Sequence, residues 1–181
     1  MPTLRNITKD MDRKYWKRFY EKGLTLEPSS FAKAVLPYVK GTLLDVGCGN
    51  YRDTNFFVFN KINAVGIDEA YGVVDEIGNY MKEFKSPNNV YARFFWHAID
   101  RKLQLEILKW TKNYIFIEAR TTEDKKKPKT YKGHRRNFVS VKQLVEDLKD
   151  NGFEIIKLEE GTGFSKFKKE DPHLVRVIAK K

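Results

Sequence analysis

The sequence predicts an α/β protein in which a mostly parallel sheet lies between layers of helices. Apolar segments short enough for strands alternate with segments of helical periodicity, and this alternation is typical of parallel strands joined by helices. A glycine-containing loop at residues 47–50 follows the first strand. Two β-like segments, 153–160 and 174–180, close the chain and predict a C-terminal antiparallel pair.

Two helices are expected before the first strand. Aromatic residues recur at helical spacing in the segment 10–22, and the segment 29–39 begins with Ser29, a favourable N-cap. We expect these segments to form an N-terminal helical cap, residues 1–40, on a core of residues 41–181. A chain of 181 residues is long enough to bury one core, so a single domain is expected.

The core strands are expected where apolar, β-branched and aromatic residues run together, at residues 42–46, 64–67, 89–95 and 114–118. Helices are expected at 53–59, 102–111 and 141–151, the last ended by Gly152. The lysine-rich segment 121–132 has no apolar periodicity. It is expected to be a loop, either a solvated linker or a lid over a substrate.

Composition limits the classes of function. Lysine and arginine number 35 against 24 acidic residues, and the formal net charge of +11 favours anionic partners. The lysines are spread along the chain, so nucleic-acid binding is the less favoured outcome. Cys48 is the only cysteine and no segment is long and apolar enough to span a membrane, so we expect a cytoplasmic protein without an internal disulfide. The three histidines are far apart, which argues against a metal site.

The loop after the first strand is the most informative segment. Gly47 and Gly49 let the backbone turn tightly beside a ligand. Asp68 follows about 20 residues later, where α/β nucleotide sites keep a carboxylate that binds the ribose hydroxyls. A dinucleotide fingerprint needs a third glycine where this chain has Arg52, so NAD is disfavoured. The pattern predicts a nucleoside pocket.

The loop Asp45-Val46-Gly47-Cys48-Gly49, with Asp68 after it, resembles the cofactor site of class I S-adenosylmethionine-dependent methyltransferases. The segments 16–20, 28–32 and 47–53 are similar to small methyltransferases of the tellurite-resistance and thiopurine-methyltransferase type. Further segments resemble a subgroup encoded near surface-polysaccharide genes, namely 91–99, 116–120, 133–136 and 171–176. The resemblance implies a Rossmann-like class I methyltransferase sandwich, with S-adenosylmethionine as cofactor and S-adenosylhomocysteine as product.

Two features depart from the family pattern. Tyr51 occupies a position where members usually carry glycine, which predicts either a wider loop or a different cover over the methionine end of the cofactor, with reduced affinity. Between Asp68 and the strand expected at 89–95, the chain is too short for the usual helix, strand and acidic loop. We therefore expect a sheet abridged around its third strand, with residues 72–74 as a shortened strand.

The resemblance also implies which residues contact the cofactor. Those in and after the glycine loop are Asp45, Gly47, Cys48, Gly49, Asn50, Asp68, Glu69 and Asp75. An N-terminal aromatic segment covers the cofactor in the resembling families, which adds Trp16 and Tyr20; ordinary core packing of these two rings is the alternative. For Cys48, packing is a better explanation than nucleophilic chemistry.

Methyl transfer to a hydroxyl is helped by a base that accepts the departing proton. His97 follows the strand expected at 89–95, and His134 lies where the basic loop returns to the core. Both are candidate bases, and His97 is slightly preferred. A structural or surface role is the alternative for each.

Arginines give the best indication of the acceptor. Guanidinium groups bind phosphate or carboxylate through paired hydrogen bonds, so Arg93, Arg120, Arg135 and Arg136 predict an anionic acceptor. The alternative is that Arg93 and Arg120 pair with Glu118 or other acids at strand ends.

Together these features predict a methyltransferase that acts on a small-molecule or glycan acceptor. The resembling subgroup implies a sugar hydroxyl of a glycan or nucleotide-sugar, and RNA or another small molecule is the alternative. A different class also stays open, because Tyr51 and the short segment after Asp68 are compatible with a cofactor-binding or scaffold protein that does not catalyse transfer.

Overall fold

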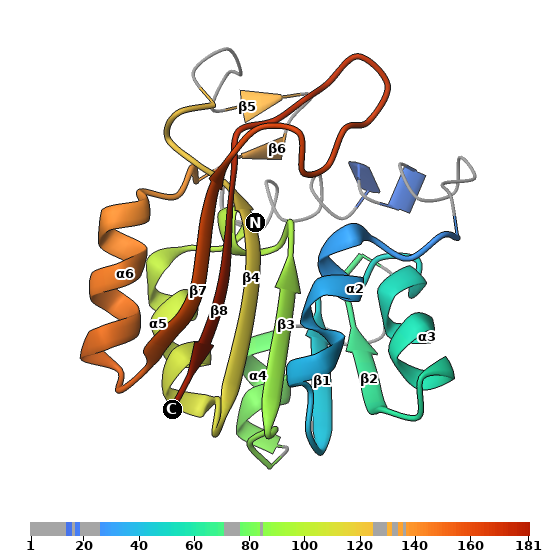
Figure 1. Ribbon diagram of the computed structural model, residues 1–181, viewed down its shortest axis with the longest axis vertical. Helices are drawn as coiled ribbons and strands as arrows, with labels where there is room; N and C mark the ends of the chain where they lie inside the picture. Colours follow the sequence, from blue (N-terminus) through green and yellow to red (C-terminus); the bar gives the residue numbers. More distant parts are fainter. Residues whose placement is uncertain are drawn as a thin grey trace, which may run out of the picture.

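The computed structural model describes residues 14–15, 17–18, 26–70, 77–83, 85–124, 130–131, 134–135 and 137–181, the pairs 130–131 and 134–135 by their backbone alone. These residues form one main sheet with helices on both faces (Figure 1). None of the described helices is long and apolar enough to cross a membrane.

Among the described residues, the main sheet has six strands in the order β2-β1-β3-β4-β8-β7. Their bounds are β1 Thr42–Val46, β2 Asn63–Ile67, β3 Asn89–Arg93, β4 Tyr114–Arg120, β7 Glu154–Gly161 and β8 Leu174–Lys180. β1 is parallel to β2 and β3, and β3 is parallel to β4, whereas β8 is antiparallel to β4 and β7. The predicted mostly parallel sheet with a C-terminal antiparallel pair is confirmed.

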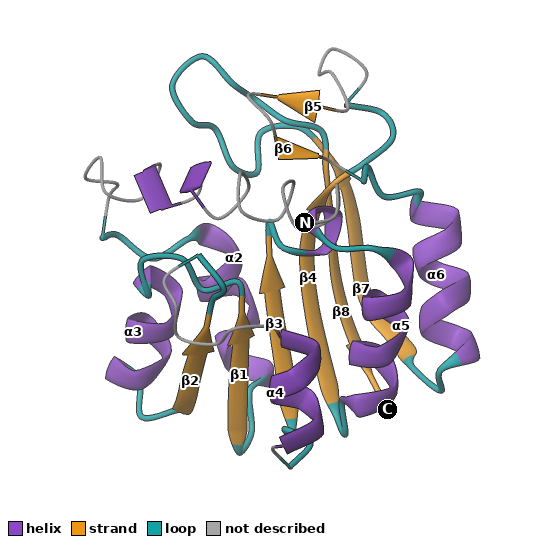
Figure 2. Cartoon of the chain, turned by 180° about the vertical axis from the view of Figure 1, so that it is seen from behind, coloured by secondary structure: helices purple, strands orange, loops and turns teal. Residues whose placement is uncertain are grey.

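The helices cover the two faces of this sheet unequally (Figure 2). One face carries α2 (Ser30–Val35), a 3-10 turn at Leu36–Tyr38, and α3 (Arg52–Phe59). The other carries α4 (Ile77–Glu83), α5 (Arg101–Trp110) and α6 (Val141–Asp150). Each face has its own apolar cluster.

Side chains alternate between these clusters along each strand, because successive residues of a strand point to opposite faces. In β1, Leu43 packs with Phe31 and Phe57 on the face of α2 and α3. Leu44 packs in the cluster that contains Ile107 of α5. The sandwich therefore follows from the two-residue period of its strands.

Helix ends occur where the sequence places capping residues. The Ser29 hydroxyl accepts the Ala32 N–H at 3.0 Å and caps α2. The Asp100 carboxylate accepts the Leu103 N–H at 2.9 Å and caps α5. Gly152 follows α6 with a φ of 81°, so the predicted terminator is confirmed.

Two strand ends and one helix differ most from the prediction. The bounds of β2 and β7 differ by one residue, and the helix expected at 29–39 is α2 followed by the 3-10 turn. β3 ends at Arg93, two residues early, because Phe94 has a left-handed φ of 55° that an extended strand cannot continue. β4 extends two residues further, to Arg120. The helix α4 lies between β2 and β3, where no helix was expected.

Some predicted elements lie partly or wholly outside the described residues. The strand expected at 72–74 is outside them, as is most of the helix expected at 10–22. The segment expected as the loop 121–132 contains β5 (Thr130–Tyr131), which pairs with β6 (His134–Arg135) in a separate two-stranded sheet.

Candidate functional site

The carboxyl ends of β1 and β3 lie where the strand order of this sheet reverses, and we call this place the crevice. The chain leaves β1 for β2 on one side and later returns to β3 on the other, and ligands bind α/β sheets where the strand order reverses in this way. The loops that follow the two strands touch, because a Cβ on Gly47 would lie 2.5 Å from the Phe95 ring. Gly47 is therefore required by space as well as by its φ of 71°.

The glycine loop is tied to the end of β2. The N–H groups of Gly47 and Cys48 donate to the Ile67 carbonyl at 2.8 and 3.2 Å. Gly49 and Tyr51 have left-handed φ values of 57° and 61°. Tyr51 thus makes the turn that glycine favours, at a cost of about 1 kcal/mol, and α3 begins directly after it.

Asp68 lies at the end of β2 and faces this loop. Its Oδ2 accepts the Gly49 N–H at 2.9 Å and its Oδ1 accepts the Ala70 N–H at 2.7 Å. The side chain is 8% exposed. An ionised carboxylate has about four acceptor sites, so Asp68 holds the loop in shape and keeps acceptor capacity for ligand hydroxyls.

Asp45 is buried at the end of β1 beneath the same loop. It accepts a hydrogen bond from the Thr54 hydroxyl at 2.6 Å. Burial, opposed by this hydrogen bond and reinforced by the nearby Asp53, raises the pKa of Asp45 to about 7. A cationic ligand group beside Asp45 would favour its charged form.

Cys48 packs between Asp45 and the second strand. A Cβ on Gly66 would lie 2.9 Å from both the Cβ and the Sγ of Cys48, so the thiol occupies space that a larger neighbour would need. Burial and the nearby carboxylates raise the pKa of Cys48 far above its usual value. The thiol therefore stays protonated and is a poor nucleophile.

The other predicted cofactor residues have different surroundings. Asn50 is half-buried in the glycine loop. The Glu69 carboxylate accepts the Ile77 N–H at 3.1 Å and so holds the start of α4 near the end of β2. Trp16, Tyr20 and Asp75 lie outside the described residues.

Asp53, in the first turn of α3, is a hub of polar contacts. It accepts hydrogen bonds from the Ser29 N–H at 2.8 Å, the Ser29 hydroxyl at 2.7 Å and the Tyr91 hydroxyl at 2.8 Å. Arg52 and Arg93 lie 3.3 and 3.9 Å from its oxygens. Burial acts to raise the pKa of Asp53, but the two arginines and Ser29 outweigh it and lower that pKa.

Glu118 in β4 is a second hub and is completely buried. Its Oε1 lies 2.9 Å from the Arg93 Nε, and its Oε2 accepts the Arg176 Nε–H at 2.6 Å. Arg176 of β8 also donates to the Ser30 hydroxyl at 2.8 Å. The Ser165 hydroxyl donates to Glu118 at 3.0 Å.

These contacts close into a cycle, which we call the polar ring: Ser29, Asp53, Arg93, Glu118, Arg176 and Ser30. It joins α2, α3, β3, β4 and β8 on one face of the sheet beside the crevice. Alternating carboxylates and guanidinium groups offset the cost of burying each charge. The ring fixes the position of the crevice walls.

Arg120, at the end of β4, is also held by carboxylates. Its guanidinium lies 2.7 Å from Asp124 and 2.9 Å from Glu170. The Phe94 ring lies between the Arg93 and Arg120 guanidinium groups, 4.7 and 5.9 Å from its centroid. Both arginines thus reach the crevice and both have carboxylate partners, as in the structural alternative raised from the sequence; their role toward an acceptor stays a prediction.

His97 is buried in the 3-10 turn Trp96–Ala98 that follows β3. Its Nδ1 accepts the Arg120 N–H at 3.2 Å, and its carbonyl accepts the Asn137 N–H at 2.7 Å. A neutral ring with an accepting Nδ1 carries its proton on Nε2. In this geometry Nε2 can donate a hydrogen bond. To act as a base through Nε2, the ring must carry its proton on Nδ1 and so release the Arg120 N–H.

The remaining predicted residues lie on or beside β6. His134 and Arg135 form this strand, whose side chains are outside the described part, and Arg136 follows it outside the described residues. Asn137 is the next described residue, and its N–H donates to the His97 carbonyl. The chain therefore returns from this segment to the crevice wall.

Sequence reasoning did not single out Thr54, Asp53, Tyr91 or Arg176 as site residues, and it raised Glu118 only as an alternative partner of Arg93 and Arg120, which the Arg93 ion pair confirms. Their partners are distant in the chain: Ser29 and Asp53 are 24 residues apart, and Ser30 and Arg176 are 146 apart. The only local signal was the serine cap before α2. Pairing at such separations is set by the tertiary fold.

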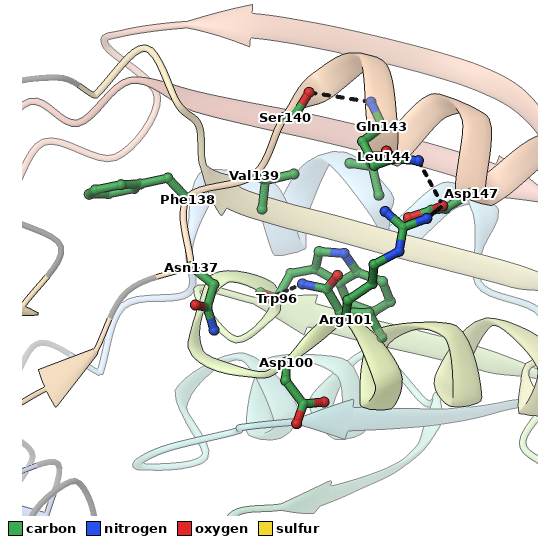
Figure 3. A pocket seen from close by; sticks show the side chains of 11 residues that line it. Trp96, Asp100, Arg101, Asn137, Phe138, Val139, Ser140, Gln143, Leu144 and Asp147 are labelled. Carbon is green, nitrogen blue, oxygen red and sulfur yellow. Dashed lines mark hydrogen bonds and ion pairs between the residues drawn. The ribbon is translucent and has the colours of Figure 1, made fainter. Parts of the chain in front are cut away.

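A hollow of about 350 Å³ lies on the opposite face, between the 3-10 turn after β3, α5 and the start of α6. Arg101 of α5 reaches Asp147 of α6 across it, at 2.6 Å (Figure 3). Trp96, which precedes His97 in the chain, and Asn137, whose N–H donates to the His97 carbonyl, both line the hollow. No residue of the glycine loop lines it, so it is separate from the crevice.

No protein-family model matches the chain, and no curated protein matches it in sequence. Solved structures do match. A SAM-dependent methyltransferase from Archaeoglobus fulgidus is 18% identical, with 99% of this chain and 100% of that one covered and a TM-score of 0.63. A SAM-dependent methyltransferase from Anabaena variabilis is 16% identical, with 99% and 96% covered and a TM-score of 0.65.

A third similar structure contains ligands. The 1,6-didemethyltoxoflavin-N1-methyltransferase of Burkholderia thailandensis, with bound 1,6-didemethyltoxoflavin and S-adenosylhomocysteine, is 13% identical, with 100% and 92% covered and a TM-score of 0.67. At these identities the likeness establishes the fold. The chain therefore has the Rossmann-like fold of SAM-dependent methyltransferases.

Proposed function

We propose that this protein transfers a methyl group from S-adenosylmethionine to a hydroxyl of an acidic sugar, in a glycan or nucleotide-sugar. One observation carries the proposal: the glycine loop after β1, Asp68 after β2 and Phe95 after β3 meet at the point where the strand order reverses. This is where α/β sheets bind nucleotide-like ligands.

The described residues fit the cofactor. Asp68 keeps acceptor capacity for the ribose hydroxyls, and buried Asp45 offers a carboxylate to a cationic group. Gly47, Cys48, Gly49 and Asn50 form the loop after β1, and Glu69 follows Asp68 after β2. We extend the proposal to Asp75, Trp16 and Tyr20. The cofactor supplies an electrophilic methyl group, so the protein's main task is to hold the acceptor oxygen in line with it.

The acceptor assignment is supported by the arginines around the crevice. Arg93 is half-buried and Arg120 is buried, and both are held in ion pairs beside Phe94, so they shape the wall while carboxylates offset their charge. Arg135 and Arg136 are the proposed direct contacts with an acidic group. Some structural neighbours act on small molecules or glycopeptides according to their names, which is compatible with an acceptor of this size.

The proton must leave the acceptor hydroxyl as the new bond forms. His97 accepts the Arg120 N–H through Nδ1, so we propose that its ring releases this N–H, carries its own proton on Nδ1 and accepts the hydroxyl proton at Nε2. His134 is the second candidate base. Substitutions at His97 and His134 distinguish these two candidate bases. His97→Asn keeps an acceptor near the Nδ1 position, and His134→Gln removes a titratable group.

The proposal is tested by transfer of a labelled methyl group to UDP-glucuronic acid, UDP-glucose and a short RNA. We expect transfer to the acidic sugar, a loss of about 100-fold in kcat for the variant that lacks the base, and unchanged cofactor affinity in both variants. Equal transfer to the neutral sugar would contradict an acidic acceptor. Transfer to RNA alone would replace the sugar assignment.

A further inference from the structure

We propose that the loop between β7 and β8, residues 162–173, is a docking arm for an acidic polysaccharide chain. The inference rests on the proposed function and specifies the form in which the acceptor is presented. The loop arches above the carboxyl end of β3, beside the crevice (Figure 1). Its position, anchoring and charge each support the assignment.

The first half of the loop is fixed to the polar ring. Arg176 donates to the Phe164 carbonyl at 3.1 Å, and its guanidinium lies 4.7 Å from the centre of the Phe164 ring. The Ser165 hydroxyl accepts a hydrogen bond from Arg93 at 3.3 Å and donates to Glu118 at 3.0 Å. The arm is therefore anchored by the same charges that fix the crevice walls.

The carboxylates of the loop are engaged in its own anchoring. Glu170 pairs with Arg120 at 2.9 Å. Asp171 accepts the Gly163 N–H at 2.6 Å and lies 3.7 Å from the Lys166 Nζ. Glu170 and Asp171 therefore hold the arm in place.

The tip of the arm is basic. Phe167 and Glu170 exchange two backbone hydrogen bonds of 2.9 Å, and Lys168 has a left-handed φ of 54°, so the chain turns sharply at Lys168 and Lys169. Both lysines are exposed. Among the described residues, neither has a carboxylate within 4.0 Å. The tip therefore presents uncompensated positive charge.

The charge of the tip, together with the acidic sugar proposed as acceptor, favours a polysaccharide over a nucleic acid. Single-stranded nucleic acids bind through bases stacked on aromatic rings. At this edge, Phe94 lies between two guanidinium groups, Phe164 lies beside Arg176, and the Lys168 Nζ is 5.4 Å from the centre of the Phe167 ring. These cations cover the rings only in part, and Phe167 is 42% exposed. The occupant therefore follows from charge: carboxylate groups spaced along a sugar chain complement the exposed Lys168 and Lys169.

The test compares two double variants in the full chain. One carries Lys168→Gln and Lys169→Gln. The control carries Lys40→Gln and Lys149→Gln, which removes the same charge from exposed sites before the starts of β1 and β7. Binding is measured at low and moderate salt with three probes: a polygalacturonate oligomer, a neutral dextran oligomer and an oligouridylate.

We expect the arm variant to bind polygalacturonate about fivefold more weakly, with a shallower salt dependence. The control variant should bind like the wild type, and dextran should not bind. Equal losses in both variants, or none in the arm variant, would overturn the docking arm. Oligouridylate binding that is tighter than polygalacturonate binding and depends on the same lysines would overturn the polysaccharide assignment.

This outcome is separable from the fate of the proposed function. Cofactor binding is measured on the same proteins by calorimetry, and neither variant should change it because none of the four lysines lies in the glycine loop. Failure to bind S-adenosylmethionine would contradict the proposed function, whereas loss of the lysine effect alone would contradict the arm.

Discussion

Ser29 and Asp53 are joined by two hydrogen bonds, one from the Ser29 N–H at 2.8 Å and one from its hydroxyl at 2.7 Å. Ser29 also caps α2, and Asp53 lies in the first turn of α3. This pair therefore connects the segment before the sheet to the helix that follows the glycine loop. Two motifs that the resemblance marked separately are parts of one polar ring.

Asp53→Asn should destabilise the protein by about 3 kcal/mol, because it removes a buried carboxylate from two arginines and three hydrogen-bond donors. The pKa of Asp53 is lowered by folding, so its stabilisation is present above the ordinary carboxyl pKa and is lost as the pH falls through the lower, folded pKa. Urea unfolding at neutral and acidic pH measures both effects. Asp150→Asn, at an exposed position on α6, is the control and should be silent.

Asp45→Asn should have the opposite effect on stability. Folding raises the pKa of Asp45 from 3.8 to about 7. The contribution of Asp45 to the free energy of unfolding is therefore fully present below pH 3.8 and is lost as the pH rises to about 7. At pH 8 the substitution should stabilise the free protein by up to about 4 kcal/mol. Thermal unfolding from pH 5 to pH 8 should then show a flatter profile than the wild type.

The same substitution should weaken S-adenosylmethionine binding about tenfold or more, because it removes the negative charge proposed to attract a cationic group of the cofactor. Gain of stability with loss of affinity is the pattern of a functional residue. A variant that is more stable and binds the cofactor as well as the wild type would show that the carboxylate has no role in binding.

Gly47→Ala and Gly78→Ala form a matched pair. At Gly47 the new methyl group would lie 2.5 Å from Phe95, on a backbone with φ of 71°, so we expect a loss of about 2 kcal/mol or more and of cofactor binding. At Gly78, in α4, no described residue beyond the neighbouring turn of the same helix lies within 4 Å of the new group. That variant should gain about 0.5–1 kcal/mol from helix propensity. Similar changes in stability for the two substitutions would contradict close packing between the loops that follow β1 and β3.

The fold was more predictable than the site. β1 and β8 have the predicted bounds, since each is a short β-favouring run bounded by a glycine or by polar loop residues. The end of β3 was not predictable, because Phe94 adopts a backbone conformation that its residue type disfavours. Only the surrounding contacts with Arg93, Arg120 and His97 account for it.

Local motifs predicted the part of the site that local geometry determines. The glycine loop and Asp68 are adjacent through parallel strands β1 and β2, so their meeting follows from strand order. The partners of Arg93 and Arg176 come from distant strands and loops. Their residue types indicated charge, and only the folded chain shows that this charge is paired.

The central claim is that the crevice between β1, β2 and β3 binds S-adenosylmethionine, and calorimetric titration of the purified protein with S-adenosylmethionine and S-adenosylhomocysteine tests it most directly. We predict micromolar binding of both, weakened about tenfold or more by Asp68→Asn and unchanged by Asp150→Asn. The thermal stability of each free variant shows whether the loop held by Asp68 is still folded. No heat and no thermal shift with either ligand in the wild-type protein would contradict the account.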